Sequence, residues 1–268
     1  TQQDVVVKQD LRGVFVTGTD TEIGKTHVSC AMVAAARRRG SRVGVMKPIA
    51  AGAAQTPRGL RNDDALSLIA AARGDAHASS VTAAEYTAVN PYCFAAPVSP
   101  HIAAAEAGVR PDLARIAGLA KVHRSENDWL VVEGAGGWLA PITAELSVSD
   151  LAIAVGLPVL VVVGLRLGCL NHAQLTVREI DRSGLPFAGW VANQIDPAMA
   201  RVDENVSMLT KRLGGPPLAR FGFGADAAAL AESGNTLIDR LVAEYATVGF
   251  LQAADIVGNS PDSGMIPR

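Results

Sequence analysis

The chain carries almost no excess of either charge. Its formal net charge is -2 at pH 7, and its one dense cationic run is Arg37, Arg38 and Arg39, directly before Gly40. Arginines before a glycine are typical of a helix C-terminus, where cations complement the helix dipole. A nucleic-acid-binding protein needs a broader basic surface. We therefore expect no nucleic-acid partner.

Cysteines and long apolar runs are also scarce. The three cysteines are too widely spaced for a zinc or redox motif, and they predict reduced thiols in a cytoplasmic protein: Cys30, Cys93 and Cys169. The longest apolar run, residues 151–165, is too short to cross a bilayer and contains a glycine and a proline. The first 13 residues lack the pattern of a secretory signal. We expect no membrane partner and a cytoplasmic location.

Short apolar runs alternate with longer amphipathic or alanine-rich segments. Five runs predict strands: GVFVTG (13–18), RVGVMKP (42–48), DWLVVEG (128–134), LPVLVVVG (157–164) and FAGWVAN (187–193). Strands that are apolar on both faces and separated by helices indicate a parallel α/β sheet covered on both sides. Ligands bind beyond the carboxyl ends of such strands. Five residues should therefore converge on one crevice: Gly18, Lys47, Glu133, Gly164 and Asn193.

Prolines and acidic residues predict where several helices begin. Ser99-Pro100 and Pro111-Asp112 each resemble a helix N-terminus. The interval 50–99 is longer than a minimal crossover, so part of it should form a functional loop over the sheet edge.

The stretch FVTGTDTEIGKT, residues 15–26, is typical of a phosphate-binding loop. Five residues separate Gly18 from Gly24, one more than in the common pattern. The stretch nevertheless lies between a predicted strand and a predicted helix, where backbone N–H groups face an anion. Lys25 would then reach the β- and γ-phosphates, and the Thr26 hydroxyl would meet Mg²⁺.

Carboxylates at the same edge are candidate magnesium ligands. Glu133 ends a predicted strand and precedes the small residues 134–137, although such a glutamate could also be merely solvated. Asp63 and Asp64 begin a predicted helix, and helix capping accounts for one of them. The other is free to bind a metal.

Lys47 follows the second predicted strand, where it could neutralise a reacting phosphate or carboxylate-like group. A solvated surface lysine is the alternative. The segment GLRLGCLNHAQLT opens a helix near residues 169–171, and a helix N-terminus binds carboxylates as readily as phosphates. We interpret His172, in the first turn of that helix, as a polar contact and not as an acid or base.

Together these residues resemble the dethiobiotin synthetase family. The resemblance covers residues 14–197 and depends on seven motifs: VTGTDTEIGKT, KPIAAG, TPRGLRNDDAL, NPYCFAAPVSPHIAA, VEGAGGWLAP, LGCLNHAQLT and GWVAN. The longer glycine loop is that family's own form. The resemblance implies a single-domain P-loop NTPase-like fold, a three-layer α/β sandwich whose mainly parallel sheet is covered by helices on both faces. It divides the chain into an N-terminal extension (1–12), the P-loop domain (13–246) and a C-terminal tail (247–268).

The resemblance also implies roles for individual residues. ATP and its Mg²⁺ would be bound by a set that includes the glycine loop: Glu22, Ile23, Gly24, Lys25, Thr26, His27, Asp64, Glu133, Gly134, Ala135, Gly136, Asn193 and Gln194. Among these, Thr26, Asp64 and Glu133 would ligate Mg²⁺, and Asn193 would recognise adenine. Lys25 and Lys47 would be catalytic. The substrate would meet Thr21, Lys47 and Ala51, and its carboxylate would meet Gly168, Cys169, Leu170 and Asn171 of the partner subunit in a homodimer.

The implied substrates are 7,8-diaminopelargonic acid, CO₂ and ATP. One amine would take up CO₂ as a carbamate, the carbamate would attack the γ-phosphate, and the other amine would close the ureido ring of dethiobiotin, as in biotin biosynthesis. A carbamate forms from a deprotonated amine, so activity should rise from acidic to mildly alkaline pH.

The chain departs from the family pattern at two places. Ala51 stands where the family commonly has serine or threonine, and LARFGFGADAA replaces the usual adenine-proximal segment. Three alternatives are an amidating ligase of the same fold, a partitioning ATPase and an inactive relative. The first normally carries a glutaminase domain and the second a further lysine at the start of the glycine loop, and the sequence provides neither.

Overall fold

The computed structural model describes residues 12–75 and 81–247. The predicted N-terminal extension and C-terminal tail therefore lie outside the described residues, except for Arg12 and Thr247. The proposed division of the chain at residues 12 and 247 stays a prediction.

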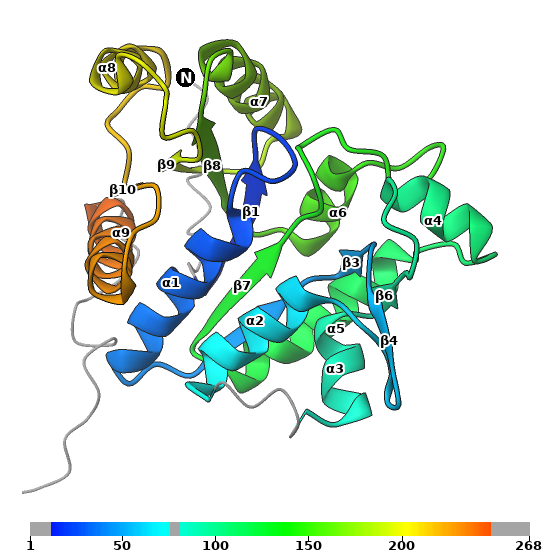
Figure 1. The fold of residues 1–268 in the computed structure, drawn as a ribbon. Coiled ribbons are helices and arrows are strands. Elements are labelled where there is room, and N and C mark those ends of the chain that lie inside the picture. The colour runs from blue at the N-terminus through cyan, green and yellow to red at the C-terminus, as the bar shows by residue number, and fades with distance from the viewer. Residues whose placement is uncertain (1–11, 76–80, 248–268) are drawn as a thin grey trace, which may run out of the picture.

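Six parallel strands form the central sheet (Figure 1). Their order across the sheet is β10 (Ala219–Phe221), β9 (Phe187–Gln194), β8 (Val159–Leu165), β1 (Gly13–Gly18), β7 (Trp129–Glu133) and β2 (Val43–Met46). All neighbours are parallel. The five predicted strands are confirmed. The edge strand β10 was not predicted, because it spans only three residues and its central Arg220 is exposed.

Helices cover both faces of the sheet, which confirms the predicted three-layer sandwich. One face carries α1 (Lys25–Arg38), α2 (Asp63–Arg73), α3 (Ala83–Val89) and α9 (Ala227–Thr247). The other carries α4 (Pro100–Glu106), α5 (Leu113–Glu126), α6 (Val148–Val155), α7 (Cys169–Ser183) and α8 (Val202–Arg212). Successive strand side chains alternate between the two cores: Val14 and Val16 face one and Phe15 faces the other. Within the described residues, no helix has the length and apolarity that crossing a membrane requires.

The interval 50–99 folds into elements of its own beside the β2 edge. A small parallel sheet pairs β3 (Ile49–Ala50) with β6 (Tyr92–Cys93), and a hairpin joins β4 (Ala54–Thr56) to β5 (Gly59–Arg61). Helices α2 and α3 lie between these strands in the sequence. The predicted functional loop is therefore partly a structured subassembly.

Two helix starts follow the predictions and one does not. Asp112 caps α5 by accepting the N–H of Ala114 at 2.8 Å, and Pro100 is the first residue of α4. The predicted capping by an aspartate at the start of α2 is wrong. The cap is Asn62, whose side chain accepts the N–H of Ala65 at 3.2 Å, so neither aspartate is needed for capping.

Candidate active site

The glycine loop connects β1 to α1 and ends in a left-handed turn. Gly24 has φ 81°, and a Cβ atom there would lie 2.2 Å from the side-chain nitrogen of Asn193. Only glycine fits this backbone without strain. Gly24 is also the N-cap of α1 and provides no side-chain cap. The first-turn N–H groups have no acceptor within the helix and can meet an anion.

The loop rests on residues at the carboxyl ends of the strands. Ile23 is 1% exposed, and its side chain fills the space that a Cβ would need at Gly18 and Gly164. Asn193 donates its amide N–H to the carbonyl of Ile23 at 2.7 Å. The expected convergence of five strand ends on one crevice is therefore only partly correct: Gly18, Gly164 and Asn193 support the loop from below, while Lys47 and Glu133 line the cavity.

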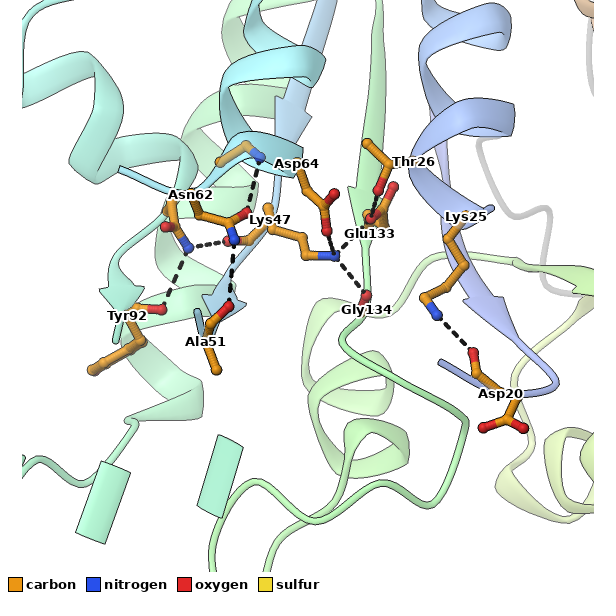
Figure 2. A network of polar contacts seen from close by, with 12 residues as sticks. Asp20, Lys25, Thr26, Lys47, Ala51, Asn62, Asp64, Tyr92, Glu133 and Gly134 are labelled. Carbon is orange, nitrogen blue, oxygen red and sulfur yellow. Dashed lines mark hydrogen bonds and ion pairs between the residues drawn. The ribbon is translucent and has the colours of Figure 1, made fainter. Parts of the chain in front are cut away.

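A charge cluster lies beside the loop, with Lys47 and Glu133 buried and the side chain of Asp64 half-exposed (Figure 2). The ammonium of Lys47 is 2.6 Å from Glu133 Oε1 and 2.9 Å from Asp64 Oδ2, and it also donates to the carbonyl of Gly134 at 3.3 Å. The hydroxyl of Thr26 donates to the same oxygen of Glu133 at 2.7 Å. Lys47 is 4% exposed, so the alternative of a solvated surface lysine is wrong. Glu133 is fully buried, so the solvated alternative is wrong for it too.

The cluster shifts the pKa values of its members. Burial alone would lower the pKa of Lys47, but the carboxylates of Glu133 and Asp64 outweigh it and raise that pKa. Burial acts to raise the pKa of Asp64, and contacts with Lys47 and Thr26 nevertheless hold it below its usual range. The site therefore holds an ionised Lys47 against ionised Asp64 at neutral pH.

Lys25 points away from this cluster. Its ammonium donates to the carbonyl of Asp20 at 2.8 Å, and the side chain of Asp20 pairs with Arg166 (Figure 2 shows the first contact). Burial, followed by the charge of Lys47, lowers the pKa of Lys25 to about 8. Lys25 is thus a poorly solvated cation at the phosphate loop, and a phosphate would favour its charged form.

A cavity of about 780 Å³ opens over the loop and the charge cluster. Most of the predicted site residues line it: Thr21, Glu22, Gly24, Lys25, Thr26, Lys47, Ala51, Asp64, Glu133, Ala135 and Gly136. The others do not: Ile23, His27, Gly134, Asn193, Gln194 and residues 168–171. Of these, Ile23 and Asn193 support the loop, Gly134 contacts Lys47, and His27 lies with its ring 6.0 Å from that of Phe221.

Sequence reasoning missed one wall of this cavity. Besides Ala50, Asn62 and Ala140, the wall comes from the segment that leads into α4: Pro97, Val98, Ser99 and Pro100. In the sequence, Ser99 is expected only to begin a helix together with Pro100. In the structure its hydroxyl does not cap α4 but lies 2.9 Å from Nδ1 of His101. The family motif NPYCFAAPVSPHIAA could have indicated this wall, because it begins within the interval 50–99 that was expected to reach the site.

The side chains around Glu133 fit a magnesium ion. Glu133 Oε2 is buried and has no hydrogen-bond partner, and a carboxylate oxygen in that state is costly unless something binds it. Thr26 and Asp64 place further oxygens beside it, and Mg²⁺ prefers oxygen ligands with phosphates completing its shell. Over residues 12–75 and 81–247 no group of three His, Cys, Asp or Glu side chains could hold a metal alone.

Comparison with known proteins identifies the family. The profile of a family described as an AAA domain matches residues 12–224. The chain is 48% identical to the ATP-dependent dethiobiotin synthetase BioD of Xanthomonas axonopodis pv. citri over 80% of this chain and 93% of that protein. It is 47% identical to BioD of Aromatoleum aromaticum over 83% of this chain and 96% of that protein. The chain belongs to the dethiobiotin synthetase family. Membership confirms the family resemblance of the sequence motifs.

A solved structure supports the fold of this dethiobiotin synthetase family member. The ParA family ATPase from Chlorobium tepidum TLS superposes with a TM-score of 0.50 at 13% identity, covering 88% of this chain and 99% of that one. At that identity the likeness concerns the fold alone.

Proposed function

We propose that this protein converts 7,8-diaminopelargonic acid, CO₂ and ATP into dethiobiotin, ADP and phosphate, with Lys25 and Lys47 as catalytic residues. The observation that carries the residue assignment is the placement of Lys47. Its ammonium is buried between Asp64 and Glu133 on a cavity that the phosphate loop also lines. The carbamate, the triphosphate and the mixed anhydride are all anionic, and buried cations stabilise such charge most effectively.

The steps are those that the family resemblance implies. One amine of the substrate, deprotonated, bonds to the carbon of CO₂ and loses a second proton, which gives a carbamate. A carbamate oxygen bonds to the γ-phosphorus, and the bond to the β-phosphate oxygen breaks to release ADP. The second amine then bonds to the carbamate carbon, phosphate leaves, and a proton is lost as the ring closes. Lys47 neutralises the carbamate and Lys25 the phosphates, which positions the reacting oxygen and phosphorus.

Thr26, Asp64 and Glu133 would hold Mg²⁺, which would neutralise part of the negative charge of the ATP phosphates. Lys47 contacts both of these carboxylates, so its ammonium offsets their negative charge beside the cavity. Asn193 as the adenine-recognition residue and Gln194 beside it are further parts of the proposal.

A homodimer is part of this proposal. Residues 168–171 do not line the cavity of their own subunit, and Leu167 beside them is 96% exposed. Other large apolar side chains are exposed on α6, α7 and the loop after β7: Leu139, Ile153 and Leu175. Exposed apolar side chains gathered on neighbouring elements are typical of a protein interface. The N-terminus of α7 would thus receive the substrate carboxylate in the partner's site. The cytoplasm is the proposed compartment, which the three unpaired cysteines favour.

The test is a product assay with labelled bicarbonate. The protein is incubated with diaminopelargonate, ¹³C-bicarbonate and Mg·ATP, and dethiobiotin is measured by mass spectrometry. We expect one ¹³C atom per dethiobiotin and one ADP per product. Omitting the diaminopelargonate should stop ADP formation. ATP turnover that continues without it, with no labelled dethiobiotin, would refute the proposal.

A further inference from the structure

A chain of buried polar side chains leads from Asn62 in the cavity wall to the backbone of Lys47 and takes no part in the chemistry proposed above. Tyr86 and Asn90, on α3 and directly after it, are each 3% exposed, and Asn62, before α2, is 8% exposed. Buried polar groups of this kind are usually either structural or positioned for function.

The hydrogen bonds of this chain run without a break from α2 to β2. The hydroxyl of Tyr86 accepts the backbone N–H of Asn62 at 2.6 Å and donates to Oδ1 of Asn90 at 2.9 Å. The side-chain N–H of Asn90 then donates to the backbone carbonyl of Lys47 at 2.5 Å. Burial raises the pKa of Tyr86, so its hydroxyl stays protonated and can donate.

Both ends of the chain are attached to the proposed reaction centre. At one end, Asn62 is the N-cap of α2, and Asp64 lies in the first turn of that helix. At the other end, the N–H of Lys47 donates to the carbonyl of Val89 at 3.0 Å. Both backbone groups of Lys47 are therefore fixed by the C-terminal end of α3.

The ion pair between Lys47 and Asp64, at 2.9 Å, closes this path into a ring. The hydrogen bonds through Asn62, Tyr86 and Asn90 connect the same two residues by a second route. A shift of α2 relative to β2 would change the separation of the ammonium from the carboxylate. Site geometry is held to within about 0.5 Å only where supporting hydrogen bonds lock it.

We propose that Tyr86 and Asn90 are positioning residues that set the separation of Asp64 from Lys47, so that α3 determines the geometry of the metal and carbamate side of the site. The inference rests on the proposed roles of those two residues. Neither Tyr86 nor Asn90 lines the cavity. Their effect would therefore appear in metal affinity and turnover, and not in the binding of the nucleotide base.

The chain offers a closely matched control. Tyr92 is also a buried tyrosine, at 7% exposed, and its hydroxyl also accepts the N–H of a helix N-cap residue, Asp112, at 2.9 Å. An arginine lies over each ring: Arg61 is 4.1 Å from the ring centre of Tyr86 and Arg115 is 5.4 Å from that of Tyr92. The helix that Tyr92 supports, α5, carries no site residue. The Tyr86 hydroxyl has two further contacts, with Asn90 and with Cys93 Sγ at 3.4 Å, so losing it should cost more stability than losing the Tyr92 hydroxyl.

The experiment compares Tyr86→Phe with Tyr92→Phe in the full chain. Urea unfolding measures the structural cost, and electron paramagnetic resonance measures the Kd of Mn²⁺ in the presence of a non-hydrolysable ATP analogue. Steady-state kinetics gives kcat and KM. We expect Tyr86→Phe to lose more stability than Tyr92→Phe, but both to stay folded. Only Tyr86→Phe should raise the Kd of Mn²⁺ and lower kcat, each by about 10- to 100-fold, with KM for ATP within about threefold of wild type.

A second variant tests the path from the other end. Asn90→Asp keeps an acceptor for Tyr86 but replaces the donor to the carbonyl of Lys47 with an oxygen. We expect kcat to fall by at least about tenfold, with a smaller change in the Kd of Mn²⁺ than in Tyr86→Phe.

Three results would overturn the inference: Tyr86→Phe with both kcat and the Kd of Mn²⁺ within twofold of wild type, equal functional losses in Tyr92→Phe, or an Asn90→Asp variant with wild-type kcat. If Tyr86→Phe does not fold, Asn90→Asp decides. If the wild-type protein forms no dethiobiotin, the proposed function fails, while the Mn²⁺ measurement still reports on Tyr86.

Discussion

Replacing Lys47 by methionine would test the charge cluster through stability as well as activity. Lys47 contacts Glu133, which is fully buried, at 2.6 Å. Methionine keeps most of the side-chain volume and removes the charge. Breaking a buried ion pair by removing one partner costs about 3–5 kcal/mol, and we expect about 3 kcal/mol because the Thr26 hydroxyl still bonds to Glu133. At about 2–4 °C per kcal/mol, Tm of the nucleotide-free protein should fall by roughly 6–12 °C.

A double-mutant cycle separates the lost pairing from lost packing. Glu133→Gln removes the buried negative charge and leaves Lys47 paired with Asp64, so it should cost less, about 1–2 kcal/mol. The double variant Lys47→Met/Glu133→Gln has neither of the two buried charges. Its loss of stability should therefore be smaller than the sum of the two single losses by at least about 1 kcal/mol.

The assay is urea unfolding at pH 7.5 with EDTA present, followed by the fluorescence of the buried Trp138 and Trp190. The exposed Lys121→Met is the control and should stay within about 0.5 kcal/mol of wild type. In kinetics, Lys47→Met should abolish turnover, while calorimetry still detects ATP binding. Strict additivity in the cycle, with Lys47→Met as stable as Lys121→Met, would refute a stabilising contact between Lys47 and Glu133. Retained turnover would remove Lys47 from the catalytic role.

Three further predictions concern the phosphate loop, the substrate and the interface. Because the pKa of Lys25 is lowered to about 8, free protein loses that charge as pH rises through 8, whereas bound phosphates favour it. ATP binding should then take up about half a proton at pH 8 and weaken about tenfold from pH 7 to 9, measured by calorimetry in buffers of different ionisation enthalpy; no proton uptake at pH 8 would contradict this. Ala51→Ser should lower KM for diaminopelargonate by about two- to tenfold, because the new hydroxyl adds one hydrogen bond to the substrate, and should leave KM for ATP unchanged. An unaltered KM for diaminopelargonate would count against Ala51 as a substrate contact. Leu167→Asp should convert the dimer into a monomer, as measured by light scattering, and should lower turnover. A monomeric wild type would refute the proposed interface.

The sequence predicts the parts of this protein that repeat a general pattern. Short runs that are apolar on both faces and end at a glycine or polar residue favour buried strands, so β1, β2, β7, β8 and β9 were all predictable. The glycine loop was predictable because its position between a strand and a helix is what its chemistry requires. Glu133 and Lys47 follow from the rule on strand ends, although that rule also included Gly18 and Gly164, which support the loop from below instead. The end of a strand in the sequence places a residue at the carboxyl ends of the strands, but the packing of the glycine loop decides which of these residues reach the cavity.

Contacts between segments that no periodic pattern links could not be predicted from the sequence. The hydroxyl of Tyr86 bonds to the backbone of Asn62, 24 residues earlier in the chain, and one buried tyrosine in AAEYTAV looks like any other core residue. Its partner Asn90 likewise resembles a helix C-terminal residue in sequence. Asp64 and Lys47 come from different elements beside the β2 edge, where a strand has a neighbour on one side only. Lys47 follows this edge strand, whereas Glu133 ends β7, which has a neighbour on each side, and the end of α3 bonds both backbone groups of Lys47. The proposed positioning of the Lys47 ammonium therefore comes from outside the sheet, through residues that the sequence pattern does not single out.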